Sequence, residues 1–243
     1  MRILIISDIH SNLAALEAVL AAAKEQEYGR VWCLGDIVGY GPDPNECITE
    51  VRNMEALCIA GNHDWAALDR IPLEDFNSDA QKATLWTRDQ LTPDSISYLE
   101  RAPEMRVEGS FTLAHGSPRH PIWEYVQLPS VAAANFAYFS TPYCLVGHSH
   151  IPVIFRHLDE YQAEIFFPPL DVPLALDQRR LIINPGSVGQ PRDGDPRASY
   201  LLLDEEAHTL QFHRVEYPIT HTQTRMMEAG LPPRLAARLA FGW

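Results

Sequence analysis

Apolar runs and amphipathic segments alternate along the first part of the chain. Residues 2–6 (RILII) form a continuous apolar run, which is typical of a strand buried on both faces. Residues 12–27 place apolar side chains at helical spacing, and Ser11 or Asn12 is suited to cap this helix. The same patterns predict a strand at 30–34, a helix that begins at Asp43-Pro44, and a strand at 56–60. This β-α-β-α-β order is typical of a parallel sheet with crossover helices.

The rest of the chain is richer in predicted strands. They are expected at 104–108, 110–114, 143–147, 153–157, 161–167, 180–183, 198–203 and 208–214. Helices are expected over 78–101 with a break at 91–93, over 130–139, and over 220–240 with a break at 230–233. No repeat, low-complexity stretch or linker separates these segments. We therefore expect a single domain over residues 1–243, with a C-terminal helical extension at about 220–243.

Composition and charge narrow the classes of partner. The chain has 243 residues, of which 46% are apolar and 21% charged, as in ordinary soluble globular proteins. Its net charge of −13 argues against a long nucleic acid or an anionic membrane as partner. A small phosphorylated substrate stays compatible, because a bound metal ion reverses the local charge. The apolar N-terminal run is too short for a signal sequence, and no run reaches the ~18 residues of a membrane span. We expect a cytoplasmic protein, and a homo-oligomer is compatible with these features.

Polar residues of the kinds that bind metal ions follow five of the predicted strands. They form the motifs Ser7-Asp8-Ile9-His10, Gly35-Asp36, Gly61-Asn62-His63-Asp64, His115-Gly116 and Gly147-His148-Ser149-His150. Each motif alone has an ordinary explanation as a turn or a helix cap. Ligands of open α/β sheets bind beyond the carboxyl ends of the strands, so together the motifs bring three aspartates, one asparagine and five histidines to one rim. We interpret the combination as a metal site.

The donor types indicate which ions this rim would bind. Histidine nitrogens with carboxylate or amide oxygens suit manganese, iron, zinc or nickel. There are too many donors for one tetrahedral ion. Asp36 has two carboxylate oxygens and is able to bridge two ions, which would then lie ~3.5–4 Å apart. We therefore expect two divalent metal ions as cofactors.

The five motifs, in this order over residues 7–150, resemble the calcineurin-like metallophosphoesterase superfamily. The segments 35–42 (GDIVGYGP) and 184–192 (NPGSVGQPR) also resemble its small bacterial and archaeal phosphodiesterase branch. The resemblance covers nearly the whole chain apart from its C-terminal stretch. It implies an α/β fold of four layers, an αββα sandwich in which two mixed sheets are flanked by helices.

The resemblance also implies how the metal ligands divide. One ion would be held by Asp8, His10, Asp36 and His150, and the other by Asp36, Asn62, His115 and His148. His63 matches the family's catalytic histidine, which protonates the leaving oxygen or stabilises the transition state. Asp64 would hold the His63 imidazole in one tautomer, or alternatively cap a helix. Two metal ions would activate a shared water, and the resulting hydroxide would attack phosphorus.

Asn62, Arg192, Arg119 and Tyr40 are the candidate substrate contacts. The alternatives are that each arginine forms a surface ion pair and that Tyr40 packs within its loop. We expect a metal-dependent phosphohydrolase, namely a phosphodiesterase acting on a small nucleotide or cyclic nucleotide. A phosphoprotein phosphatase of the same superfamily, which needs an open and shallow groove, stays an alternative. So does a non-catalytic interaction scaffold, although the intact ligand set counts against it.

Overall fold

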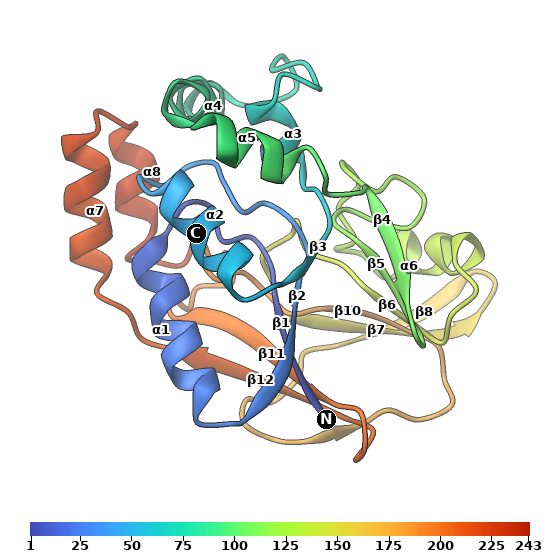
Figure 1. The fold of residues 1–243 in the computed structure, drawn as a ribbon. Coiled ribbons are helices and arrows are strands. Elements are labelled where there is room, and N and C mark those ends of the chain that lie inside the picture. The colour runs from blue at the N-terminus through green and yellow to red at the C-terminus, as the bar shows by residue number, and fades with distance from the viewer.

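Two six-stranded mixed sheets lie face to face at the centre of the molecule in the computed structural model, which describes residues 1–243 (Figure 1). The first sheet has the order β3-β2-β1-β11-β12-β9 and contains β1 (Arg2–Ile6), β2 (Tyr28–Cys33), β3 (Leu57–Cys58), β9 (Leu174–Ala175), β11 (Ala198–Asp204) and β12 (Thr209–Val215). The second has the order β4-β5-β6-β10-β7-β8 and contains β4 (Met105–Glu108), β5 (Phe111–Ala114), β6 (Tyr143–Leu145), β7 (Val153–Asp159), β8 (Gln162–Phe166) and β10 (Leu181–Asn184).

Helices cover the outer faces of both sheets. Helices α1 (Leu13–Lys24) and α2 (Pro44–Asn53) pack against the first sheet, and α6 (Pro129–Asn135) with the short 3₁₀ turn η1 (Phe136–Tyr138) packs against the second. The remaining helices are α3 (Asn62–Ala67), α4 (Ser78–Gln90), α5 (Pro93–Leu99), α7 (Ile219–Glu228) and α8 (Pro233–Arg238). The four layers confirm the predicted αββα fold class.

Strand β1 shows why its sequence is apolar at successive positions. Ile3 and Ile5 face the core between the two sheets, whereas Leu4 and Ile6 face the core beneath the helices. All four side chains are fully buried. A strand at the centre of a layered fold is covered on both faces, which removes the polar alternation of a surface strand.

Some boundaries differ from the prediction. Strand β3 has two residues rather than five, because the Ala60 N–H donates to the Pro103 carbonyl and so leaves the sheet ladder. The predicted helix over 130–139 ends earlier and tightens into η1. Strand β9 was not predicted. None of the helices is long and apolar enough to cross a membrane. The division into one domain with a C-terminal extension stays a prediction.

Candidate metal centre

The residues singled out at the strand ends lie together at one rim of the sandwich. They are Asp8, His10, Asp36, Asn62, His63, His115, His148 and His150, and none is more than 4% exposed. They follow β1, β2, β3, β5 and β6, which belong to both sheets. The site therefore spans the two layers and depends on their packing.

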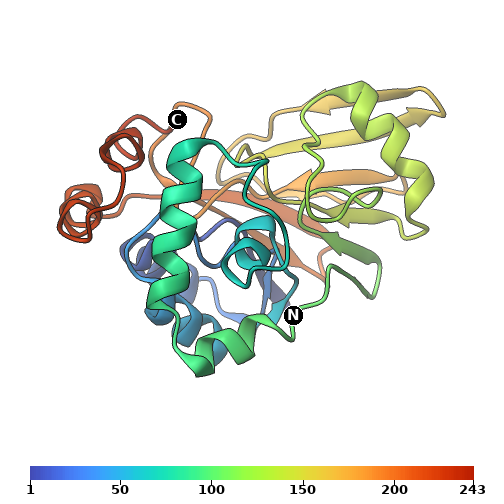
Figure 2. The ribbon, with the colours of Figure 1, turned by 90° about the horizontal axis from the view of Figure 1, so that it is seen from above.

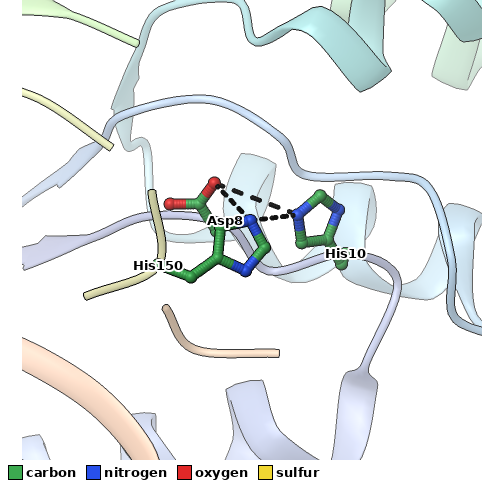
Figure 3. Close-up of side chains that lie close together, drawn as sticks. All are labelled: Asp8, His10 and His150. Carbon is green, nitrogen blue, oxygen red and sulfur yellow. Dashed lines mark hydrogen bonds and ion pairs between the residues drawn. The ribbon is translucent and has the colours of Figure 1, made fainter. Parts of the chain in front are cut away.

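Asp8, His10 and His150 form the first group of potential ligands (Figure 3). The Asp8 Oδ1 atom lies 3.3 Å from His150 Nε2 and 3.9 Å from His10 Nε2. The two histidine Nε2 atoms face one another at 3.2 Å. The three side chains thus direct one oxygen and two nitrogens at a common point.

Asp36, His115 and His148 form the second group. Asp36 Oδ2 is 3.2 Å from His115 Nε2 and 3.6 Å from His10 Nε2, so this oxygen lies between the two groups. The Asn62 Oδ1 atom lies 3.2 Å from His115 Nε2. The structure thus brings together every residue that the sequence predicted as a metal ligand.

Main-chain carbonyls orient the four histidines of these groups. His10, His115 and His150 each direct Nδ1 at a carbonyl oxygen, and His148 directs Nε2 at one. The partners are Val38 at 3.2 Å, Leu34 at 2.7 Å, Gln190 at 2.5 Å and Trp123 at 3.2 Å, respectively. A carbonyl only accepts hydrogen bonds, so the facing ring nitrogen carries the proton. In each neutral ring the other nitrogen therefore presents a lone pair, as a metal ligand requires.

The arrangement fits a bound cation. With both Nδ1 atoms protonated, the Nε2 atoms of His10 and His150 face one another as two lone pairs. This contact is repulsive unless a positive charge lies between them. Asp36 Oδ2 is likewise buried without a hydrogen-bond partner. Mixed nitrogen and oxygen donors of this kind suit a divalent transition metal.

Burial and neighbouring charges shift the ionisation of these groups in the metal-free protein. Burial lowers the pKa of His10, His148 and His150 and raises the pKa of Asp8 to about 6. Burial also disfavours the charged forms of His115 and Asp36, but their mutual attraction prevails. The pKa of His115 is therefore raised to about 9, and that of Asp36 is lowered.

The backbone beneath the ligands is strained. Asp8, His10, Asp36, His148 and His150 all have left-handed φ angles, between 49° and 65°. Non-glycine residues in this region cost about 1–3 kcal/mol each and cluster at functional sites. The strain turns side chains that leave three different strand ends, those of β1, β2 and β6, toward one point.

Comparison with known proteins identifies the family. The family model of the calcineurin-like phosphoesterase superfamily domain matches residues 1–208. The chain belongs to this superfamily. This match confirms the resemblance inferred from the motifs. The members of this superfamily are hydrolases that use divalent metal ions, and the chain has groups of residues that could bind them.

Two relatives match the chain over almost its full length, and a third matches part of it. An uncharacterized protein of Methanocaldococcus jannaschii is 39% identical over 248 residues, which cover 99% of this chain and 98% of the relative. The crystal structure of a metallophosphoesterase from Sphaerobacter thermophilus superposes with a TM-score of 0.90 at 49% identity and covers 100% of both chains. A symmetrical bis(5'-nucleosyl)-tetraphosphatase of Pectobacterium carotovorum is 30% identical over 118 residues, covering 45% of this chain and 40% of the relative.

His63 forms a third group of potential metal ligands with His10 and Asp36. Its ring centroid is 4.3 Å from that of Tyr40, 4.9 Å from that of His10 and 5.1 Å from that of Phe76. Its Nδ1 atom has no hydrogen-bond partner. Burial lowers the pKa of His63 to about 4 in the metal-free protein. The ring is thus positioned by aromatic packing, and its Nδ1 atom is buried without a partner.

The expectation that Asp64 orients His63 is wrong. The Asp64 carboxylate accepts hydrogen bonds from the backbone N–H groups of Asp36 at 2.8 Å, Gly61 at 3.0 Å and Val38 at 3.2 Å. Gly61 is the N-cap of α3, and Asp64 at the third position of this helix accepts from the Gly61 N–H in a capping box, so the alternative that Asp64 caps a helix is confirmed. Its carboxylate lies where the loop after β2 meets the start of α3. The hydrogen bonds that it accepts there come from backbone N–H groups rather than from a side chain. Asp64 therefore holds the Asp36 loop in place.

The predicted substrate contacts have different surroundings. Arg192 lies over the Tyr40 ring at 5.9 Å, donates to Gln190 Oε1 at 2.9 Å and has no acidic partner. The Arg119 guanidinium is paired with Glu124, as the ion-pair alternative predicts, and a role in substrate binding stays a prediction. Tyr40 is only 7% exposed. Its ring packs on His10 and His63, as the loop-packing alternative predicts.

A pocket of about 400 Å³ opens beside His63 and Asn62. Phe76, Trp123 and Tyr125 line it together with Tyr40. The Tyr125 ring also stacks on His148 at 3.8 Å. Sequence reasoning missed Phe76, Trp123 and Tyr125, because they lie in irregular segments without periodicity. The proximity of Trp123 and Tyr125 to the His115 motif was the only available signal. We call this space the catalytic pocket.

Proposed function

We propose that the protein is a phosphodiesterase that binds two divalent metal ions and hydrolyses a small nucleotide substrate. The observation that carries this proposal is the orientation of the buried histidines. Four main-chain carbonyls direct four ring nitrogens into a space shared with Asp8 and Asp36. Apolar side chains would fill this volume more favourably if its role were structural.

Two sets of ligands would hold the ions. Asp8, His10 and His150 would bind one, and His115, His148 and Asn62 would bind the other, with Asp36 shared between them. Manganese, iron, zinc and nickel all suit these donors. When bound, such ions supply an activated hydroxide and neutralise negative charge on the phosphate during ester hydrolysis.

His63 would act on the leaving group from the edge of this site. Its pKa is low in the metal-free protein because the ring is buried. An anionic phosphate beside the ring favours the protonated form, so substrate binding raises this pKa toward neutrality. A protonated His63 donates to the leaving oxygen and stabilises the departing alkoxide. Arg192 would hold a phosphate oxygen, since its charge has no acidic partner in the protein.

The shape and lining of the catalytic pocket support a nucleotide. Its aromatic residues offer ring faces for a base, and stacking contributes about 1–3 kcal/mol per base in other proteins. The Pectobacterium relative is named for a dinucleotide substrate, which agrees with this assignment. A phosphoprotein phosphatase is expected to present an open and shallow groove instead. No comparable feature favours it here.

Metal loading and a substrate panel test the proposal. The protein is loaded with manganese, iron, zinc or nickel, and metal content is measured by mass spectrometry. Hydrolysis is then assayed with bis(4-nitrophenyl) phosphate, cyclic nucleotides, dinucleoside polyphosphates and phosphopeptides. We expect two ions per chain, loss of turnover with a chelator, and preference for nucleotides over phosphopeptides. A metal-replete protein that hydrolyses none of them would instead support a scaffold role.

A further inference from the structure

The Glu124 carboxylate links the loop before α6 to α6 itself. It accepts hydrogen bonds from Ser117 Oγ and from Asn135 Nδ2, each at 2.7 Å. The Arg119 guanidinium also donates to it, from Nε at 3.3 Å. Helix α6, which carries Asn135, is yellow-green in Figure 2 and lies on the opposite side of the molecule from α7 and α8. We call Glu124, Ser117, Arg119 and Asn135 the Glu124 cluster.

A negative charge lies at the centre of the Glu124 cluster. Burial disfavours the charged form of Glu124, but the hydrogen bonds of the cluster prevail and lower its pKa. Hydrogen bonds to a charged acceptor are roughly twice as strong as those between neutral groups. Ser117 and Asn135 are fully buried, so the loss of this acceptor would leave buried donors without a partner. The carboxylate therefore fixes how the loop lies against α6.

The residues on either side of Glu124 orient His148. The Trp123 carbonyl accepts a hydrogen bond from His148 Nε2 at 3.2 Å, which leaves Nδ1 as the free lone pair. The Tyr125 ring stacks on the His148 imidazole, with 3.8 Å between the ring centroids and 21° between the ring planes. The carbonyl thus sets the tautomer of His148, and the aromatic ring sets the plane of the imidazole. Both come from the segment that Glu124 holds in place.

The same loop packs closely beside His115. Gly116 follows this histidine directly, and its N–H donates to the Pro121 carbonyl at 2.5 Å. A Cβ atom at Gly116 would lie only 2.9 Å from the main-chain nitrogen of Glu124. The loop that contains Glu124 therefore borders both histidines of the second group of potential ligands.

The histidines of the first group are oriented from other loops. His10 directs Nδ1 at the Val38 carbonyl, and His150 directs Nδ1 at the Gln190 carbonyl. Neither carbonyl belongs to a loop that is hydrogen-bonded to the Glu124 cluster. A change at Glu124 should therefore reach the second group without disturbing the first.

We propose that Glu124 is a positioning residue that sets the affinity of the second ion site, the one that contains His115 and His148. Its carboxylate holds Trp123 and Tyr125, and these two residues aim His148 Nδ1 at the ion. The first ion site does not depend on Glu124. This inference rests on the proposed function for the presence of two ions and assumes nothing about the substrate.

Variants of the full chain test the role of Glu124. Glu124→Gln is compared with wild type and with Glu164→Gln, which removes a half-exposed carboxylate paired with Arg156. Manganese affinities are measured by competition with a chelating dye, and metal content is measured by mass spectrometry. Electron paramagnetic resonance distinguishes a coupled pair of manganese ions from a single ion. Thermal melts confirm folding, and Ser117→Ala removes a single donor of the cluster if Glu124→Gln is unstable.

We expect Glu124→Gln to bind the second manganese ion about 10–100-fold more weakly and the first within about twofold of wild type. At limiting manganese the variant should show the signal of isolated ions where wild type shows that of a coupled pair. Excess manganese should restore turnover of bis(4-nitrophenyl) phosphate, which a general loss of structure would not allow. Glu124→Asp keeps the charge and should recover part of the affinity, and Glu164→Gln should match wild type.

Equal affinity of wild type and Glu124→Gln for the second ion would overturn the inference. Equal weakening of both ions, or a wild-type protein that binds a single ion, would overturn it as well. A protein that binds two ions, loses the second in Glu124→Gln and hydrolyses no phosphoester would support the inference and refute the proposed function.

Discussion

The rim that holds the histidines and the core between the two sheets are equally buried, yet they are built in opposite ways. The core contains apolar side chains such as Ile3, Trp32 and Phe212, contributed by regular strands. The rim contains carboxylates and imidazoles on left-handed backbone, and Asp36 Oδ2 is buried there without a partner. Burial of apolar surface stabilises the fold, whereas burial of unpaired polar atoms opposes it. The sandwich thus supports a rim whose buried donors suit bound cations.

Removing the shared carboxylate is the strongest test of this contrast. Asp36→Asn takes away the oxygen that lies between the two ligand groups. We expect metal content to fall toward zero and turnover of bis(4-nitrophenyl) phosphate to fall by roughly three orders of magnitude. The matched control Asp177→Asn removes an exposed carboxylate paired with Arg179 and should change neither. Full metal content in the Asp36 variant would show that this residue does not bridge two metal ions.

A variant of His63 tests whether catalysis and metal binding depend on different residues of the rim. His63→Ala should lower kcat by about a hundredfold or more while both metals stay bound, because the ligand atoms of both groups come from other residues. Metal analysis and steady-state kinetics are performed on the same sample. His221→Ala, on the exposed face of α7, is the control. A metal content that falls as far as turnover would make His63 a ligand instead.

Gly61 tests how closely the rim is packed around Asp36. A methyl group at this position would overlap Asp36 Oδ1, although the backbone there is unstrained for alanine. We expect Gly61→Ala to weaken metal affinity by about 10–100-fold, the effect typical of residues that position ligands. Gly29→Ala faces only the flexible Met1 side chain and should bind metal as wild type does. Equal metal affinities of Gly61→Ala and wild type in competition titrations would contradict the tight packing of Gly61 against Asp36.

The stability of the metal-free protein should depend on pH through the rim. Burial lowers the pKa of His10, His148 and His150 in the folded state, so near pH 6.5 the unfolded chain binds protons that the folded protein does not. Each histidine then lowers stability by at most about 1.4 kcal/mol per pH unit as pH falls. Asp8, Asp64 and His115, whose pKa values are raised in the folded state, oppose this, and the low pKa of His63 adds to it. Denaturant unfolding at pH 7 and pH 5 should show a net loss at pH 5, and manganese should increase stability at pH 7.

The smallest expected effect is a difference in KM between variants of Arg119 and Arg192. Arg119→Gln should leave KM within twofold of wild type, because its guanidinium is already paired with Glu124. Arg192→Gln should raise KM by about tenfold, since it removes a charge that has no acidic partner. Steady-state kinetics with one nucleotide substrate compare the two variants directly. Equal KM values would show that Arg192 does not bind substrate.

Sequence reasoning located the candidate metal ligands because apolar runs mark strand ends. Asp8 and His10 follow such a run directly, and in this architecture the strand ends meet at one rim. The carbonyls of Val38 and Gln190 that orient His10 and His150 could not be predicted, because a main-chain carbonyl has no residue-specific signal.

The differences between the structure and the predictions have the same physical origin. Asp64 binds backbone N–H groups of a loop whose course depends on left-handed residues such as Asp36. Arg119 lies near His115 in the sequence, but its position is set by Glu124 and Asn135 in space. Strand β9 pairs over two residues with β12, too short a stretch for periodicity to show.

Crystals of the manganese-loaded protein test the central claim most directly. Anomalous scattering locates the ions independently of the ligand assignment. We expect two peaks about 3.5–4 Å apart with the Asp36 carboxylate in contact with both. A single peak, or two peaks that Asp36 does not touch, would contradict a shared two-metal centre.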